Sequence, residues 1–101
     1  MFKYQVIRGA RKILELPESA TMEHIKVNYR RLIKKWHPDS CSDNHEICEK
    51  MSRKITDAYR VILDYCSNYM YSFEKEEVDK YLSEEEWLYQ RYGADPIWGN
   101  Y

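Results

Sequence analysis

The sequence predicts an all-α protein of one domain, with an antiparallel pair of long helices, a short helix before them and one or two helices after them. Its 101 residues are enough for one modest hydrophobic core and too few for two. Three glycines and three prolines are too few for the many turns of a β-sandwich. Apolar residues also recur at steps of three and four, which is the period of an amphipathic helix.

The first helix is predicted over the segment IRGARKILEL. Its apolar residues share one face at helical spacing: Ile7, Ala10, Ile13 and Leu14. Pro17 cannot continue a helix, and it disfavours the helical conformation in the residue before it. We therefore expect this helix to end near Leu16.

The second helix is predicted to begin after Thr21, whose hydroxyl can cap the first turn. An apolar stripe then recurs at steps of four, three and four, made of Ile25, Tyr29, Leu32 and Trp36. Pro38 has no N–H and restricts His37 to extended conformations. The helix should therefore end near Trp36.

The outer side of this second helix is strongly positive. Lys26, Arg30 and Lys34 follow one another at steps of four, and Arg31 and Lys35 lie beside them. Charge is also uneven along the chain, because residues 1–71 carry thirteen Lys/Arg and nine Asp/Glu, whereas residues 72–101 carry three and eight. We expect the positive face to bind an acidic partner, which the acidic tail would either repel or compete with.

A third helix is predicted from Asn44 to Cys66 or slightly beyond. Its apolar residues again recur at steps of three and four: Ile47, Met51, Ile55, Ala58, Ile62 and Cys66. Only a short loop, from His37 to about Asp43, separates it from the second helix. Two long helices joined in this way should pack antiparallel.

The acidic, aromatic-containing residues 71–101 are predicted to add one or two helices. Ser72 is a candidate cap for FEKEEVDKY, and Ser83 with Glu86 forms a capping box before Trp87. We expect this extension to pack on the same domain. Two alternatives remain open: it presents an aromatic patch to a client or dedicated partner, or it covers the positive face and restrains activity.

The segment KVNYRRLIKKWHPD, followed by ITDAYRVIL, resembles the second helix, loop and third helix of the J-domain in the DnaJ co-chaperone family. The resemblance is strongest over residues 10–66 and indicates a J-domain at 1–70, of the minimal, J-domain-only type. It implies a protein that is no enzyme itself but docks on a DnaK-type heat-shock protein 70 chaperone, at the ATPase domain and interdomain linker, and stimulates ATP hydrolysis there. The residues implied for stimulation are His37, Pro38 and Asp39, and the implied docking face is Lys26, Tyr29, Arg30, Arg31, Lys34 and Lys35.

The chemistry of the tripeptide agrees with this interpretation. Pro38 holds φ at about −65°, which limits the conformations of the loop and lowers the entropy lost when a partner orders it. His37 and Asp39 then offer a hydrogen-bond donor and a carboxylate acceptor. The sequence leaves the family pattern directly afterwards, at Ser40 and Cys41, where the preference for a particular chaperone is expected to lie.

Two other kinds of function compete with this interpretation. A nucleic-acid-binding domain would use KVNYRRLIKK as a recognition helix, but the net charge of −1 and the acidic tail argue against it. A small zinc site would use His37, Cys41, His45 and Cys48, although no paired C-x-x-C knuckle is present. Cys41 and Cys48 would lie about 10 Å apart along a helix, so no disulfide is predicted.

No enzymatic activity and no cofactor are expected. The sequence lacks a nucleophile-and-base set and a Gly-rich phosphate loop. No segment approaches the roughly 20 apolar residues of a membrane span, and the first residues lack the apolar run of a signal peptide. We therefore expect a cytoplasmic protein, monomeric by default, that binds neither membrane nor nucleic acid.

Overall fold

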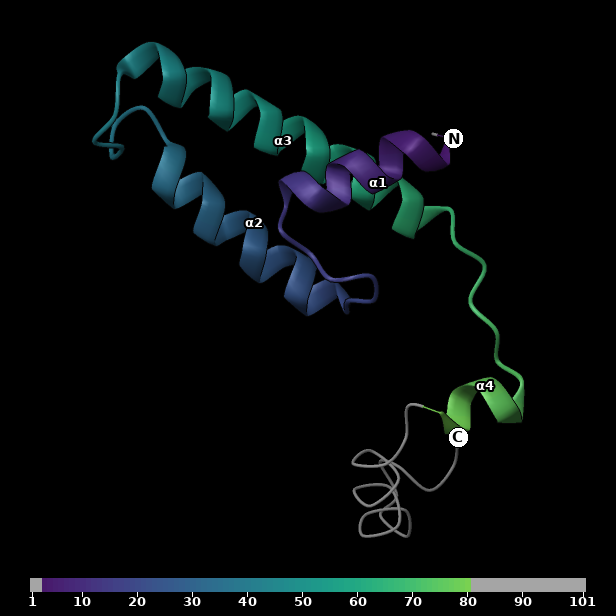
Figure 1. The fold of residues 1–101 in the computed structure, drawn as a ribbon. Coiled ribbons are helices and arrows are strands. Elements are labelled where there is room, and N and C mark those ends of the chain that lie inside the picture. Colours follow the sequence, from purple (N-terminus) through teal and green to yellow (C-terminus); the bar gives the residue numbers. More distant parts are fainter. Residues whose placement is uncertain (1–2, 81–101) are drawn as a thin grey trace, which may run out of the picture. The chain divides into compact units, whose positions relative to one another are not determined.

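Four helices make up the part of the chain that the computed structural model describes, residues 3–80 (Figure 1). The chain divides into two compact units, Met1–Tyr69 and Met70–Tyr101. The first unit contains α1 (Tyr4–Ile13), α2 (Met22–Trp36) and α3 (His45–Ser67), and the second contains α4 (Lys75–Asp79). No strand occurs in residues 3–80, and the all-α prediction is confirmed.

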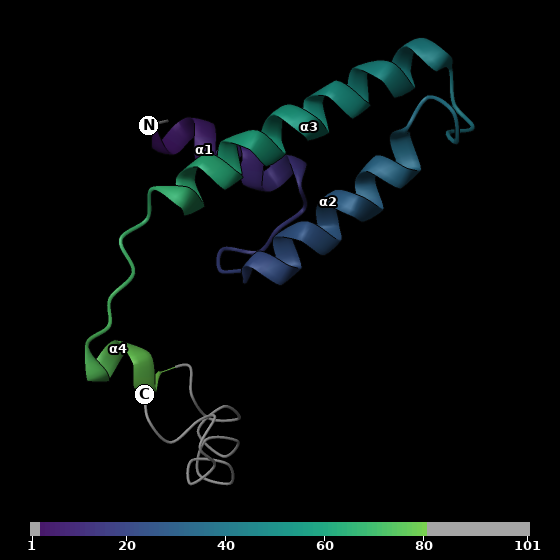
Figure 2. The same cartoon turned by 180° about the vertical axis from the view of Figure 1, so that it is seen from behind.

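In the first unit, α2 and α3 form the predicted antiparallel hairpin. They lie side by side, and the loop that joins them is at the end of the hairpin farthest from α1 (Figure 1). Figure 2 shows the same hairpin from behind, with α1 against the C-terminal half of α3. The loop between α2 and α3 therefore forms one tip of this unit.

The end of α1 differs from its prediction, because the helix stops three residues before Leu16. Glu15 has φ 54°, which is left-handed backbone. Its N–H donates to Lys12 O and the N–H of Leu16 donates to Arg11 O, each at 3.0 Å. These two bonds form a Schellman motif, which satisfies the last carbonyls of a helix. The helix thus ends in a Schellman motif with Glu15 in the left-handed conformation, two residues before Pro17.

Both predicted ends of α2 are confirmed. The hydroxyl of Thr21 accepts a hydrogen bond from the N–H of His24 at 3.1 Å, so the first turn is capped. The helix ends at Trp36, and His37 takes the extended conformation, ψ 133°, that a residue before proline prefers.

The third helix begins as predicted, with the Asn44 side chain accepting a hydrogen bond from the N–H of Glu46 at 2.8 Å. Its apolar stripe is wrong at the start, however, because Ile47 is 52% exposed and the neighbouring Cys48 is fully buried. Steps of three and four lead back from Met51 to either residue, so spacing alone did not decide which one faces inward.

A single cluster of buried side chains joins the three helices. Leu14 and Ile55 lie at its centre, at 0% and 1% exposed. The other members are Ala10, Leu16, Ile25, Leu32, Ala58 and Ile62, with Tyr29 and Trp36 partly buried against them. Truncating a leucine in such a core costs about 2–5 kcal/mol, so this cluster holds α2 firmly against α3.

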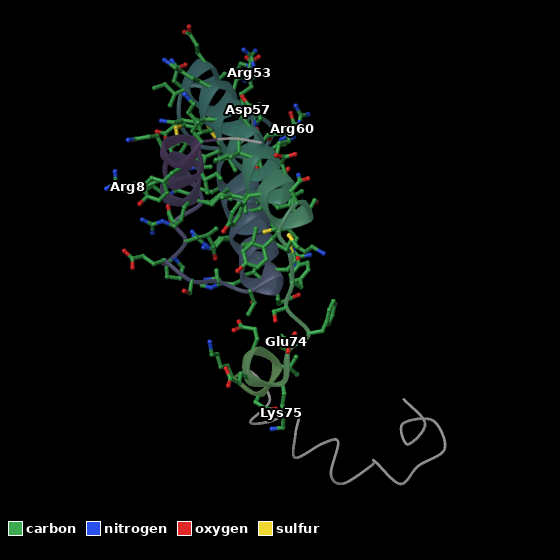
Figure 3. All side chains as sticks on the ribbon, turned by 90° about the vertical axis from the view of Figure 1, so that its right-hand side faces the viewer. Arg8, Arg53, Asp57, Arg60, Glu74 and Lys75 are labelled. Carbon is green, nitrogen blue, oxygen red and sulfur yellow. A yellow bond between two sulfur atoms is a disulfide. The ribbon has the colours of Figure 1, made fainter. Side chains whose placement is uncertain are left out.

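The opposite side of α3 faces solvent. Arg53, Asp57 and Arg60 project from it (Figure 3), and Arg53 pairs with Glu49 one turn earlier, at 2.7 Å between Nη2 and Oε1. This face carries charges of both signs, in contrast to the outer face of α2. It therefore provides a reference surface for experiments on charge.

The second unit is described only as far as residue 80. Its helix α4 has Glu74 at the N-cap position, and the Ser72 hydroxyl accepts a hydrogen bond from the Glu74 N–H at 3.2 Å. Ser72 thus stabilises the turn before the helix and does not cap it. The capping box predicted at Ser83 and Glu86 lies outside the described residues. In residues 3–80, no helix combines the length and the apolar character needed to cross a bilayer.

Candidate functional site

The chain turns at His37–Asp39, which we call the His-Pro-Asp turn. The N–H of His37 still donates to Ile33 O at 2.8 Å, so its position is set by α2. Its carbonyl oxygen then accepts hydrogen bonds from the N–H groups of Ser40 at 3.0 Å and Cys41 at 2.9 Å. The turn is therefore closed by its own backbone and continues directly from α2.

Ser40 ties this turn back to α2 through its side chain. The carbonyl of Lys34 has no helical partner, because the residue four positions later is Pro38, which has no N–H. The Ser40 hydroxyl donates to that carbonyl oxygen at 2.8 Å and also lies 3.4 Å from His37 O. Ser40 thus supplies the donor that proline cannot, a role that sequence reasoning missed.

His37 and Asp39 face each other across the turn. The Asp39 N–H donates to His37 Nδ1 at 3.2 Å, and Asp39 Oδ2 lies 3.7 Å from the same nitrogen. A ring nitrogen that accepts a hydrogen bond carries no proton, so the neutral imidazole has its hydrogen on Nε2. The two side chains are 50% and 92% exposed. The turn therefore presents an imidazole donor and a carboxylate acceptor to solvent.

Lys26, Arg30 and Lys34 form an exposed row along the outer side of α2, which we call the basic row. They lie one helical turn apart, so the row is about 12 Å long. Within residues 3–80, none of the three is in an ion pair. The positive charge thus leads along α2 towards the His-Pro-Asp turn and stays available to a partner.

Two further cations of the predicted docking face interact inside the domain. Arg31 Nη2 pairs with Glu15 Oε1 at 2.8 Å, at the left-handed turn that ends α1. The Nζ atom of Lys35 lies 5.3 Å from the centroid of the Trp36 ring, within the range of a cation–π contact. Both groups are exposed as well, so these contacts leave their charges at the surface.

Tyr29 is the member of the predicted docking face that packs inward. Its ring stacks on that of Tyr59 from α3, with centroids 3.9 Å apart and planes 8° from parallel. The side chain is half-buried. Tyr29 therefore helps to hold α2 on α3, in addition to the docking role that the resemblance implies.

Asn28 positions α2 and was missed by sequence reasoning. Its amide Nδ2 donates to Leu14 O at 3.0 Å and to Glu15 O at 3.2 Å, while the residue is only 8% exposed. These bonds attach α2 to the end of α1 and limit rotation of α2 about its axis. A detectable signal existed, because Asn28 is a polar residue on the apolar stripe, three residues after Ile25 and four before Leu32.

The structure joins Cys41 to Cys48 by a disulfide, so the prediction that these residues cannot be bridged is wrong. The prediction placed both on one helix, whereas Cys41 lies in the loop before α3 and the chain folds back at that point. The two Cα atoms are 6.4 Å apart, inside the disulfide range of about 4.4–6.8 Å.

The zinc alternative is not favoured by this arrangement. It needs the sulfurs of Cys41 and Cys48 as separate thiolate ligands, but here they are bonded to each other. Across residues 3–80, no group of three or more His, Cys, Asp or Glu side chains is placed to hold a metal ion.

Comparison with known proteins matches residues 11–71 to the DnaJ domain family. The chaperone protein DnaJ of Thermotoga petrophila is 42% identical over 60 residues, which are 59% of this chain and 16% of that protein. Human DnaJ homolog subfamily B member 2 is 43% identical over 53 residues, 52% of this chain and 16% of that protein. Human DnaJ homolog subfamily B member 3 is 40% identical over 53 residues, 52% of this chain and 37% of that protein. This chain thus spans only part of these relatives, and no solved structure matches it significantly.

Proposed function

Because this chain belongs to the DnaJ domain family, we propose that it is a co-chaperone that docks on a DnaK-type heat-shock protein 70 chaperone and stimulates its ATP hydrolysis. The relatives are named as chaperones and DnaJ homologs, which supports a role in chaperone action. The observation that carries the proposal is the exposed His-Pro-Asp turn at the end of the basic row. The domain would perform no chemistry itself and would act on the ATPase of its partner.

The proposed task of the basic row is to bring an acidic surface of the chaperone to the turn. Its three cations lie on one side of α2 and have no ion-pair partner within residues 3–80. Charges of this kind raise the rate of association more than the final affinity, and salt screens them over about 10 Å at 0.1 M. Docking should therefore be fast and sensitive to salt.

The proposed task of the His-Pro-Asp turn is to engage the chaperone's ATPase domain and interdomain linker. His37 Nε2 offers a donor and the Asp39 carboxylate an acceptor. Pro38 and the Ser40 hydroxyl hold both groups in place before the partner arrives. Such preorganisation lowers the entropy that binding costs.

Tyr29, Arg31 and Lys35 would border the contact. The ion pair of Arg31 with Glu15 is a surface pair worth roughly 0.2–1 kcal/mol, so a partner carboxylate can replace it at little cost. Residues 71–101 are proposed as an extension that binds a client or a dedicated partner. We propose the cytoplasm as the site of action, as the sequence predicts.

The test is the steady-state ATPase rate of a DnaK-type chaperone with this protein and with its His37→Gln variant. Wild type should raise the rate, and His37→Gln should abolish the increase while circular dichroism shows unchanged helix content. His24→Gln is the matched control, because His24 is an exposed histidine in the first turn of α2, at the other end of the helix. Equal stimulation by wild type and His37→Gln would refute the proposal.

A further inference from the structure

We propose that Cys41 and Cys48 are a reversible thiol–disulfide site that controls how firmly the His-Pro-Asp turn is held, and thereby how tightly this protein docks on its chaperone. The inference rests on the proposed function and adds its regulation. The chemical signal would be a low-molecular-weight disulfide such as glutathione disulfide. A pair of this kind is expected to respond to oxidants, since cytosolic disulfides are usually transient and redox-sensing.

The position of the pair supports this role. Cys41 comes two residues after the His-Pro-Asp turn, and its N–H donates to His37 O at 2.9 Å. Cys48 lies in the first turns of α3 and is fully buried. The disulfide therefore runs from a residue that is hydrogen-bonded to the turn to a buried residue on the neighbouring helix.

The disulfide differs from the other restraints on the turn. Within the described chain, the hydrogen bonds and ion pairs of residues 37–41 lead back to α2 or to the loop itself. None of them reaches α3. Reduction would thus remove the cross-link to α3, and the turn would be held by its hydrogen bonds to α2 and joined to α3 only through the backbone of the loop. The Cys41 sulfur lies 3.8 Å from Asp43 O, where a thiol can form only a weak hydrogen bond.

The unequal burial of the two sulfurs sets the order of the reaction. Cys41 is partly exposed, so its thiolate attacks one sulfur of glutathione disulfide and forms a mixed disulfide, releasing one glutathione thiolate. The Cys48 thiolate then attacks the Cys41 sulfur and releases the second. The protein loses two protons and two electrons, and glutathione disulfide is reduced to two thiols. Cys66 stands apart from this exchange, because burial raises the pKa of its thiol and lowers its thiolate fraction.

The direction of the effect follows from preorganisation. The oxidised form presents His37 and Asp39 on a turn held from both helices, whereas the reduced form keeps only the hydrogen bonds to α2 and within the loop, so docking must restrict more of the loop's motion. Reduction should therefore raise the half-saturating concentration for ATPase stimulation by roughly threefold to tenfold. The basic row is unaffected, so the salt dependence of docking should be the same in both forms.

The test compares the full chain after treatment with glutathione disulfide or with reduced glutathione, each then removed by gel filtration. Labelling with N-ethylmaleimide in denaturant should add one label to the oxidised chain and three to the reduced chain, because the sequence has three cysteines. ATPase stimulation is then titrated with both forms. Cys41→Ser should behave as the reduced form after either treatment, and the control Cys66→Ser should still switch.

Two results would overturn the inference alone. One is three labels after glutathione disulfide treatment, and the other is the same half-saturating concentration for both forms. Absence of stimulation by either form at any concentration would overturn the proposed function as well. The label count does not depend on that function, so the two failures can be told apart.

Discussion

Replacing Asn28 with alanine should lower the free energy of unfolding by about 2 kcal/mol. The side chain is 8% exposed and makes two hydrogen bonds, at 3.0 and 3.2 Å, to carbonyls at the end of α1. Each bond contributes roughly 0.5–1.5 kcal/mol net, and the carbonyl of the fully buried Leu14 would be left without this donor. For a domain of 60–100 residues, 2 kcal/mol corresponds to roughly 8–16 °C in Tm.

Urea and thermal unfolding, followed by circular dichroism, measure this change. Asn28→Asp sharpens the test, because the carboxylate has nearly the same size but cannot donate to either carbonyl, and it adds a buried charge. This variant should lose more stability than Asn28→Ala. Val27→Ala is the matched control on the exposed side of α2 and should stay within about 0.5 kcal/mol of wild type. If Asn28→Ala unfolds at the same urea concentration as Val27→Ala, Asn28 does not hold α2 to α1.

Three further predictions concern the surroundings of the site. Tyr29→Ala should lower the free energy of unfolding in urea by about 2 kcal/mol, because it removes the stacking on Tyr59. Tyr29→Phe keeps the ring and should be nearly neutral, and equal losses in the two variants would contradict the stacking role. Glu15→Gly should be about 1 kcal/mol more stable than Glu15→Ala, since both lose the ion pair to α2 but only glycine adopts φ 54° without strain. Equal Tm values for the two variants would refute the left-handed strain at this position. Arg30→Glu should raise the half-saturating concentration for ATPase stimulation roughly tenfold at low salt and far less at high salt. Arg60→Glu changes the same charge on the outer face of α3 and should leave the half-saturating concentration unchanged. Equal increases in both variants would show that only the net charge of the protein matters.

The helix boundaries that could be predicted are those set by strong local signals. Thr21 caps α2 and Asn44 caps α3 through their side-chain oxygens, and Pro38 ends α2 through its restricted backbone, so each boundary depends on one residue. The end of α1 was not predictable in the same way. It depends on Glu15 in a left-handed conformation that glutamate rarely adopts, and bonds from α2 help to hold that turn.

The exposed residues of the candidate site could be predicted from the sequence, but the contacts that hold them in position could not. Helical periodicity alone places the basic row on the outer side of α2. The groups that hold the site join parts of the chain that fold back on one another. The Asn28 side chain bonds to the carbonyls of Leu14 and Glu15, and Cys41 bonds to Cys48 in α3. Spacing along a single helix carries no information about such contacts. For this reason the distance of about 10 Å, which assumed that Cys41 and Cys48 lie along one helix, wrongly excluded a disulfide between them.

Single-turnover ATP hydrolysis by a DnaK-type chaperone, measured against increasing concentrations of this protein, tests the central claim most directly. The account predicts a rate that rises to a plateau with wild type, that stays at the basal level with His37→Gln, and that reaches the wild-type plateau with Arg30→Glu only at higher concentration. It would be contradicted if His37→Gln reached the wild-type plateau, or if Arg30→Glu lowered the plateau without changing the half-saturating concentration.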